Sequence, residues 1–295
     1  MIPTKTSVTR QLRLFHCNPF LLLLLSLFFV YLVPATSYSE AAQVVASANS
    51  GNDSEQPLEV RYKRAMKHWR YVLTTYVDEQ GRTNFHALAK DIEPLEYVVS
   101  VIEVVSPSAT PQLFPSKEDV LAFYINTYNA LAMYGVIERG IPDGFTNFFS
   151  RASFFKLRDV VIGGEVTNLY DFENDVIRPL DEPRVHFALN CMVKDCPRLP
   201  QEPFYAHNLD SVLESLTTAF FANPKHFYLD SKHKRAYVSE ILDFYTEDFV
   251  ESGKSRDLPQ YINRYLESEI PSHYKVRFID YDWRINSTDT VGVSK

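Results

Sequence analysis

The feature that most constrains the fold is an apolar stretch, Val120–Ile137, that contains no charged side chain. Ser116 and the acids that follow it are a pattern typical of a helix start, and a Gly-Ile-Pro sequence ends the pattern. We therefore predict a helix over about 117–139. Asn126 and Asn129 interrupt the stretch on one face, so it fits a helix buried in a protein core better than a membrane span.

The rest of the pattern predicts an α+β fold. Helical spacing of apolar residues recurs along the chain, and strands appear as a hairpin with a Gly-Gly turn and a second hairpin with a basic tip. Because helices outnumber strands, we expect a mostly helical single domain with a small sheet made of hairpins, around the central buried helix. We expect helices at 58–75, 168–178, 208–222, 239–251 and 258–269, hairpins at 160–167 and 226–238, and a strand at 275–279.

The N-terminal 35 residues resemble an export signal. Three basic residues and no acidic residue precede Phe20–Val33, an apolar run of 14 residues that is short for a permanent membrane span. We expect a cleaved signal peptide at 1–35 and a secreted or periplasmic protein. The alternative is an uncleaved anchor, which would be its only contact with a membrane. We expect a flexible leader at 36–57, a globular domain at 58–287 and a disordered tail at 288–295.

The negative net charge of the chain limits the kinds of partner that it can bind. The net charge is −7, and loss of the signal peptide with its three basic residues lowers it to −10. We therefore expect no binding of nucleic acid, which requires clustered Lys and Arg. The basic stretch Lys232–Arg235 is interpreted as a solvated hairpin tip. Asn52 and Asn286 begin glycosylation sequences, which apply only in a eukaryotic host.

The segment 184–197 carries the residues that are best suited to catalysis, metal binding or disulfide formation. It places His186, Cys191 and Cys196 within a short distance along the chain, and the remaining cysteine lies in the export segment. An even number of cysteines in an exported chain favours a disulfide between Cys191 and Cys196. Such a loop of six residues would stabilise the fold by about 2 kcal/mol.

Two other interpretations of this segment stay open. In the first, Cys191 is a nucleophile, His186 its base, Asn129 and Asn126 donate to an oxyanion, and Glu173 is an acid or base. However, in a continuous strand over 184–190, His186 and Cys191 would face opposite sides. In the second, the histidine and both cysteines bind zinc. Their spacing is unusual for a zinc site and exported thiols tend to be oxidised, so we expect no cofactor.

The two asparagines also have a structural explanation. A buried amide is costly unless it is hydrogen-bonded, so Asn126 and Asn129 would hold a neighbouring loop. We expect the central helix to lie behind the 184–190 segment, with both amides reaching the Cys191 loop.

Several stretches resemble the family called domain of unknown function 547, and together they span about residues 60–286. They are Gly81–Phe85, Ala122–Ala130, Val166–Glu173, Pro183–Cys191 with Cys196-Pro197, and Tyr281–Asn286. The resemblance implies a fold and a set of polar positions but no reaction. Where the family tends to have Glu-His, this chain has Glu173-Asn174.

These observations leave two functions. The first is binding of a ligand or an envelope partner through a polar pocket around His186, Cys191 and Cys196, the ligand being an unknown small molecule, peptide or envelope component. The alternative is a thiol-dependent hydrolase or acyl transferase that acts on peptide or cell-envelope substrates. Whether the protein is an enzyme stays open at this point.

Overall fold

A computed structural model describes residues 54–288. The chain divides into residues 1–56 and a compact unit that begins at Pro57. The expected signal peptide, nearly all of the leader and most of the tail lie outside the described residues, as does Asn52. The fold is that of the unit from Pro57 to Thr288.

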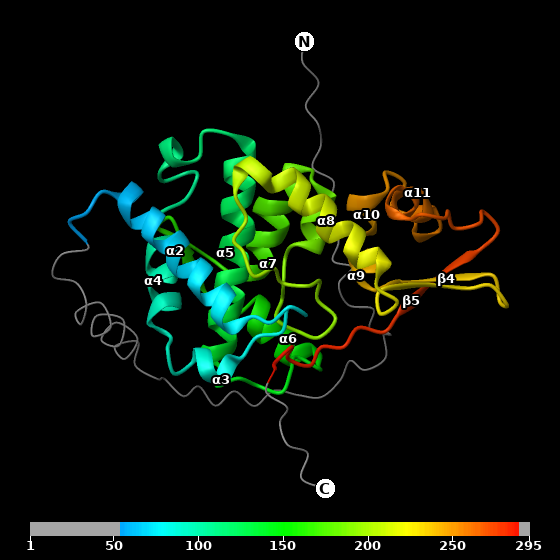
Figure 1. Cartoon of the computed structure of the whole chain (residues 1–295), viewed down its shortest axis with the longest axis horizontal. Coiled ribbons are helices and arrows are strands. Elements are labelled where there is room, and N and C mark those ends of the chain that lie inside the picture. Colours follow the sequence, from blue (N-terminus) through cyan, green and yellow to red (C-terminus); the bar gives the residue numbers. More distant parts are fainter. Residues whose placement is uncertain (1–53, 289–295) are drawn as a thin grey trace, which may run out of the picture. The chain divides into compact units, whose positions relative to one another are not determined.

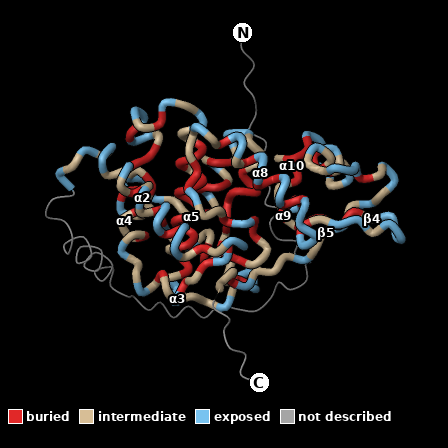
Figure 2. Tube along the Cα trace, viewed as in Figure 1, coloured by how far each residue is buried: buried red, intermediate tan, exposed pale blue. Residues whose placement is uncertain are grey.

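Helix α5, Lys117–Glu138, is the centre of this unit (Figures 1 and 2). It begins with a capping box, in which Ser116 Oγ accepts a hydrogen bond from Asp119 N at 3.0 Å and the Asp119 carboxylate accepts one from Ser116 N. Among the described helices, α5 is long and apolar enough to cross a membrane, but 78% of its apolar window is buried inside the protein. That burial is typical of a core helix, and the predicted central helix is confirmed.

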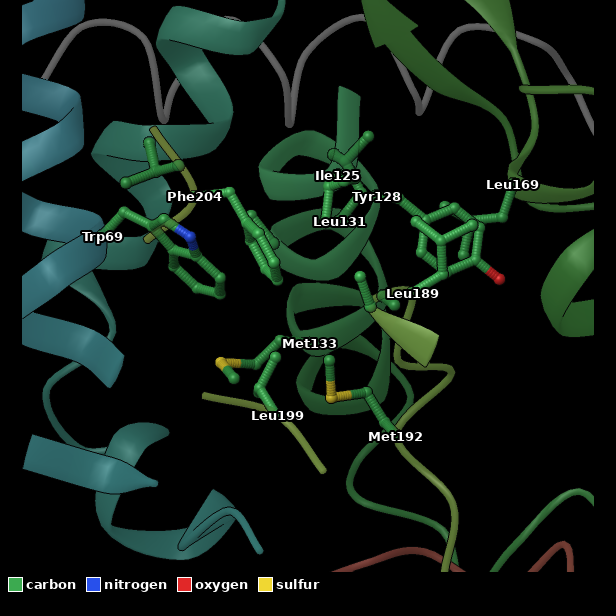
Figure 3. Close-up of a cluster of buried hydrophobic side chains, with 14 of the residues drawn as sticks. Trp69, Ile125, Tyr128, Leu131, Met133, Leu169, Leu189, Met192, Leu199 and Phe204 are labelled. Carbon is green, nitrogen blue, oxygen red and sulfur yellow. The ribbon is translucent and has the colours of Figure 1, made fainter. Parts of the chain in front are cut away.

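In the described part of the chain, three α-helices precede α5, and α4 packs against it. Helix α2 packs against α4, and its Trp69 enters the core. Figure 3 shows Trp69 and Phe204 on one side of α5, with Leu169 on the other side. The three helices are α2 Leu58–Tyr76, α3 Phe85–Leu88 and α4 Glu93–Ile102.

The chain after α5 forms a helix, a hairpin and an irregular helical segment. The hairpin has its Gly-Gly turn at the predicted place. After it, Asn168 caps the next helix by accepting a hydrogen bond from Asp171 N at 2.9 Å. That helix continues as a π-helical turn, a conformation that occurs often at functional sites. The elements are α6 Phe148–Phe155, β1 Val160–Ile162, β2 Glu165–Thr167, α7 Leu169–Asp171, the π-turn Phe172–Ile177 and a 3₁₀ turn Arg178–Leu180.

A second hydrophobic cluster lies under a three-stranded sheet of order β3-β4-β5. β3 and β4 form the predicted hairpin, whereas β5 is parallel to β4, so this sheet is not made of hairpins alone. The predicted helix over 239–251 is broken into two short helices by the non-helical backbone of Tyr245. The elements are α8 Leu209–Ala222, β3 Phe227–Asp230, β4 Arg235–Ser239, α9 Ile241–Phe244, α10 Thr246–Phe249, α11 Pro259–Ile262 and β5 Lys275–Ile279.

The continuous strand considered for residues 184–190 does not form. Pro183–Phe187 is a 3₁₀ helix, with proline at its first position and Glu182 accepting a hydrogen bond from Arg184 N at 3.1 Å. A strand with one buried face has alternating buried and exposed residues. Here every residue from Val185 to Asn190 is buried, so this alternation is absent. The structure as a whole is an α+β fold, as predicted.

Candidate functional site

The loop after Asn190 is closed by a disulfide bond between Cys191 and Cys196, whose Cα atoms are 6.1 Å apart. Asn190 braces the same loop, since its Nδ2 donates to Pro197 O and its Oδ1 accepts from Met192 N, both at 2.7 Å. Met192 has a positive φ of 66°, which costs free energy for a residue with a side chain. A covalent bond and two hydrogen bonds therefore fix the conformation of this loop.

Asn129 attaches α5 to the segment that leads into the loop. Its Oδ1 accepts a hydrogen bond from Asn190 N at 2.7 Å, and its Nδ2 donates to Ala188 O at 3.0 Å. Asn129 is 1% exposed, so both bonds are shielded from water. Both the oxygen and the nitrogen of its amide are therefore hydrogen-bonded to the main chain, which supports a structural role for Asn129.

Asn126 does not reach the disulfide loop. Its Oδ1 accepts hydrogen bonds from Trp69 Nε1 at 3.1 Å and Phe204 N at 3.0 Å, and its Nδ2 donates to Phe204 O at 2.8 Å. Asn126 also lines a small apolar cavity between α2, α4 and α5. The expectation that both amides reach the Cys191 loop holds for Asn129 alone, because one helical turn directs Asn126 toward a different segment.

Glu173 lies in the π-turn and is only 8% exposed. The hydroxyl groups of Tyr128, on α5, and Tyr245 face its carboxylate. Burial, and after it the charge of Glu173, raises the pKa of Tyr128 and of Tyr245 well above the usual value for tyrosine. Among residues 54–288, no Lys, Arg or His side chain forms an ion pair with Glu173.

Tyr281 connects this carboxylate to the disulfide. Its hydroxyl lies 3.7 Å from Cys191 Sγ. Burial, and then the charges of Asp195 and Glu173, raise the pKa of Tyr281. Cys191, Tyr245 and Tyr281 are each partly exposed, whereas Glu173 and Tyr128 are buried. We call Tyr128, Glu173, Cys191, Tyr245 and Tyr281 the Glu173 cluster.

His186 borders this cluster without forming a described hydrogen bond to Cys191. Its ring stacks on Tyr245, with centroids 4.0 Å apart, and its Nε2 lies 2.9 Å from Asp248 Oδ2. Arg178 donates two hydrogen bonds to Asp248, at 2.6 and 2.8 Å. Burial alone would raise the pKa of Asp248, but hydrogen bonds from His186 and Arg178 lower it strongly. Asp248 therefore fixes the ring of His186, and Arg178 in turn fixes the carboxylate of Asp248.

Asn174, the departure from the family pattern, supports this arrangement. Its Oδ1 accepts a hydrogen bond from Arg178 Nη1 at 2.6 Å, and its Nδ2 donates to Tyr170 O at 2.7 Å. Asn174 thus helps to position Arg178 against Asp248.

The C-terminal segment closes over the disulfide loop. Its main chain pairs with the loop, with Asn286 N donating to Met192 O at 2.9 Å and Asp282 N donating to Asp195 Oδ2 at 2.7 Å. The ring of Trp283 lies 4.9 Å from that of Tyr281, and the guanidinium of Arg151 lies over it. The site is thereby tied to the end of the described chain.

The structure thus brings Glu173, His186 and Cys191 into one neighbourhood, through Tyr245 and Tyr281, and leaves Asn126 outside it. Sequence reasoning missed five side chains of this neighbourhood. Tyr128, at helical spacing in an apolar run, has the pattern of a core residue, and no sequence signal pairs Arg178 with an acid about seventy positions away. The missed residues are Tyr128, Arg178, Tyr245, Asp248 and Tyr281.

Within residues 54–288, no group of three or more His, Cys, Asp or Glu side chains is arranged to hold a metal ion. His207, which could complete a zinc site with His186 and the cysteines, instead stacks on Tyr205 with centroids 5.7 Å apart. The expectation of no cofactor stays a prediction.

No curated protein and no solved structure matches this chain. Residues 113–221 match the model of the family described as "Protein of unknown function, DUF547". The match covers α5, the π-turn, the disulfide loop and α8, and so includes Tyr128, Glu173, His186 and both cysteines of the disulfide. This segment of the chain, residues 113–221, is therefore similar to the DUF547 family.

Proposed function

We propose that this protein binds a ligand through a positively charged nitrogen, which pairs with the carboxylate of Glu173. The observation that carries the proposal is a carboxylate that is 8% exposed, lies beside two tyrosine hydroxyls and has no ion-pair partner among the described residues. An uncompensated buried charge is costly for a folded protein. An ammonium group on a ligand would neutralise this charge through short, charge-assisted hydrogen bonds.

The side chains between Glu173 and the surface suit such a ligand. Tyr245 and Tyr281 are partly exposed, and the ring of Phe244 lies 5.7 Å from that of Tyr281. Aromatic faces attract cations, and the attraction grows as the cation loses water. These rings favour a cationic nitrogen over a neutral polar group. Amino groups of peptides and of amino sugars have this chemistry, in keeping with a peptide or cell-envelope ligand.

In this proposal His186 is a positioning residue. Asp248 fixes one edge of its ring, and its face packs on Tyr245. That contact restricts the ring of Tyr245 and so aims its hydroxyl at Glu173. The linked contacts of Arg178, Asp248 and His186 then preorganise the site before the ligand binds. Preorganisation lowers the entropic cost of binding.

The alternative, a thiol-dependent hydrolase or acyl transferase, draws support from the partly exposed Cys191 beside Tyr281 and Glu173. The thiolate is the nucleophile in such enzymes, and a sulfur bonded to Cys196 has none. This alternative therefore requires a reduced loop, and a base other than the Asp248-bound His186. Binding requires neither change.

The test is calorimetric titration of the purified protein with two pairs of compounds that differ only in charge. The pairs are glucosamine with N-acetylglucosamine, and trialanine with N-acetyl-trialanine. We expect the free amine of a pair to bind and its acetylated partner to bind at least about tenfold more weakly. Glu173→Gln should abolish that preference, whereas Glu165→Gln, on the exposed β1–β2 hairpin, should preserve it.

Equal binding of the amine and the amide, an unchanged preference in Glu173→Gln, or no binding of any of the four compounds would overturn the proposal. Peptide or ester hydrolysis that appears only after reduction and is lost in Cys191→Ala would favour the alternative function.

A further inference from the structure

The sheet β3-β4-β5 has one face in the second hydrophobic cluster and one face turned outward. Ala236 and Val238 on the inner face are fully buried. The register places two rows on the outer face. One row is Asp230, Arg235 and Lys275, and the other is Tyr228, Tyr237 and Arg277. We call these six residues the outer sheet face.

Positive charge gathers on the outer sheet face. Arg235 and Lys275 are direct neighbours on adjacent strands, and Arg277 follows two positions along β5. Lys232 and Lys234 lie in the adjoining β3–β4 turn. Among residues 54–288, no carboxylate forms an ion pair with any of these five cations. The one acid of the outer sheet face, Asp230, instead binds His233 through Nδ1 at 2.6 Å.

Arginines elsewhere in the described chain are commonly paired with acids. Arg158 pairs with Glu138, Arg178 with Asp248, and Arg184 with Glu182. The sheet therefore gathers several cations without an ion-pair partner on one face of a chain of net charge −7. They bring together residues from β4, from the turn and from β5, about forty positions apart.

Only part of this arrangement stabilises the fold, through Asp230 opposite Arg235. Like charges directly opposite each other on adjacent strands destabilise a sheet. Charged residues on an edge strand also discourage unwanted pairing, which would account for Lys275 and Arg277 on β5. Arg235, on the central strand, lies opposite Asp230 on β3. A hydrogen bond with Tyr237, and after it the charge of Asp230, raises the pKa of Arg235. A partner that neutralises Lys275 and Arg277 would also remove the repulsion between Lys275 and Arg235.

The edge of β5 offers a place for such a partner. Among the described strands, β5 pairs only with β4, so no strand occupies its other edge. Val276 O, on this edge strand, accepts a hydrogen bond from the side chain of Arg277 at 2.9 Å. A strand added at this edge would continue the sheet by main-chain hydrogen bonds, as in other cases of peptide recognition by strand addition.

We propose that an extended acidic segment of a partner protein adds to the outer edge of β5 and places acidic side chains over the outer sheet face. Alternate side chains of a strand share one face and repeat about every 7 Å. Lys275 and Arg277 have this same spacing. The segment therefore carries Glu or Asp at alternate positions. Tyr228 and Tyr237, stacked 4.7 Å apart, form an aromatic border next to Arg277 on the same face.

The experiment measures fluorescence anisotropy of two labelled peptides with the purified protein. One peptide has glutamate at alternate positions, and the other has the same composition with its glutamates consecutive. We expect the alternating peptide to bind about tenfold more tightly, and its affinity to fall as salt rises. The double variant Lys275→Glu/Arg277→Glu should lose this binding and instead bind a peptide with lysine at alternate positions.

The matched control is Lys63→Glu/Lys67→Glu, which makes the same change of charge on α2, away from the sheet, and should bind the acidic peptide normally. Glu173→Gln should also bind it normally, so the two proposals fail separately. Equal affinity for both glutamate peptides, no binding of either, or binding to phosphatidylglycerol vesicles or polygalacturonate in place of the peptides would overturn the inference. Because Lys275 and Arg277 are exposed, thermal unfolding should confirm that the double variant remains folded.

Discussion

The hydroxyl of Tyr245 faces the carboxylate of Glu173, and burial, together with the charge of this carboxylate, raises the pKa of the tyrosine. The ring of the same tyrosine stacks on His186, which Asp248 binds. Tyr245 therefore lies between the buried carboxylate of Glu173 and the ring of His186, which contacts Asp248. The two acids differ in their compensation, because Arg178 neutralises Asp248 and no described cation neutralises Glu173.

This difference predicts that Glu173→Gln stabilises the ligand-free protein. Glutamine has nearly the same shape and can still present a side-chain oxygen to both tyrosine hydroxyls, but it carries no charge to bury. We expect the free energy of unfolding to rise by about 1 kcal/mol in urea denaturation at neutral pH. The conservative Asp248→Asn should act in the opposite direction, because it leaves the Arg178 charge without its partner. A clear loss of stability in Glu173→Gln would show that the charge is compensated in the free protein.

Asn129→Ala should destabilise the protein by about 3 kcal/mol. The substitution leaves Asn190 N and Ala188 O without partners in the core, and each unsatisfied buried group costs about 1–3 kcal/mol. Urea denaturation measures the loss. The matched control is Asn223→Ala, which removes one hydrogen bond at an exposed position and should cost less than about 1 kcal/mol. Similar losses in the two variants would mean that the Asn129 bonds contribute little.

The central helix and the disulfide could be predicted because their signals are local. The start of α5 is encoded by Ser116 and Asp119, three positions apart, and its burial by a long uncharged run. The pairing of Cys191 with Cys196 follows from their proximity along the chain, since the third cysteine lies within the N-terminal 35 residues. Asn129 was foreseen as an anchor because a buried amide requires partners.

The surroundings of His186 could not be predicted, because they depend on contacts between distant segments. Its partner Asp248 lies 62 positions away. Its stacking partner Tyr245 lies at the break between α9 and α10, where helical spacing predicts one continuous helix. Leu242 and Phe249 are buried on either side of this break, so core packing of the two short helices outweighs helical continuity.

The disulfide loop predicts a defined loss of stability on reduction. By loop entropy, a bond that closes six residues contributes about 2 kcal/mol. The double variant Cys191→Ser/Cys196→Ser should lose that amount in urea denaturation, and reductant should affect the parent protein but not the variant. Thiol counting on the denatured parent should find neither residue alkylated until reductant is added. Two thiols that react without reductant would contradict the bonded state.

Protonation of His226 should make the protein less stable in acid. This side chain is 5% exposed and stacks on Phe220, with centroids 4.1 Å apart. Burial, and then the charge of Lys225, lowers the pKa of His226 to about 4 from an ordinary value of 6.5. Between these two values the unfolded chain binds a proton that the folded protein does not, so stability rises with pH across this window and levels off above it. A difference of this size is worth about 3 kcal/mol.

Urea denaturation between pH 4 and pH 7 should show this slope, and His226→Phe, which keeps a ring on Phe220, should flatten it. His233→Asn, at an exposed position, should leave the slope in this window largely intact. Burial raises the pKa of Glu103 and Glu240, which gives a slope of opposite sign in both the parent and the variant. The difference between the two proteins therefore isolates His226, and parallel curves for parent and His226→Phe would mean that this histidine is protonated in the folded protein as readily as in the unfolded chain.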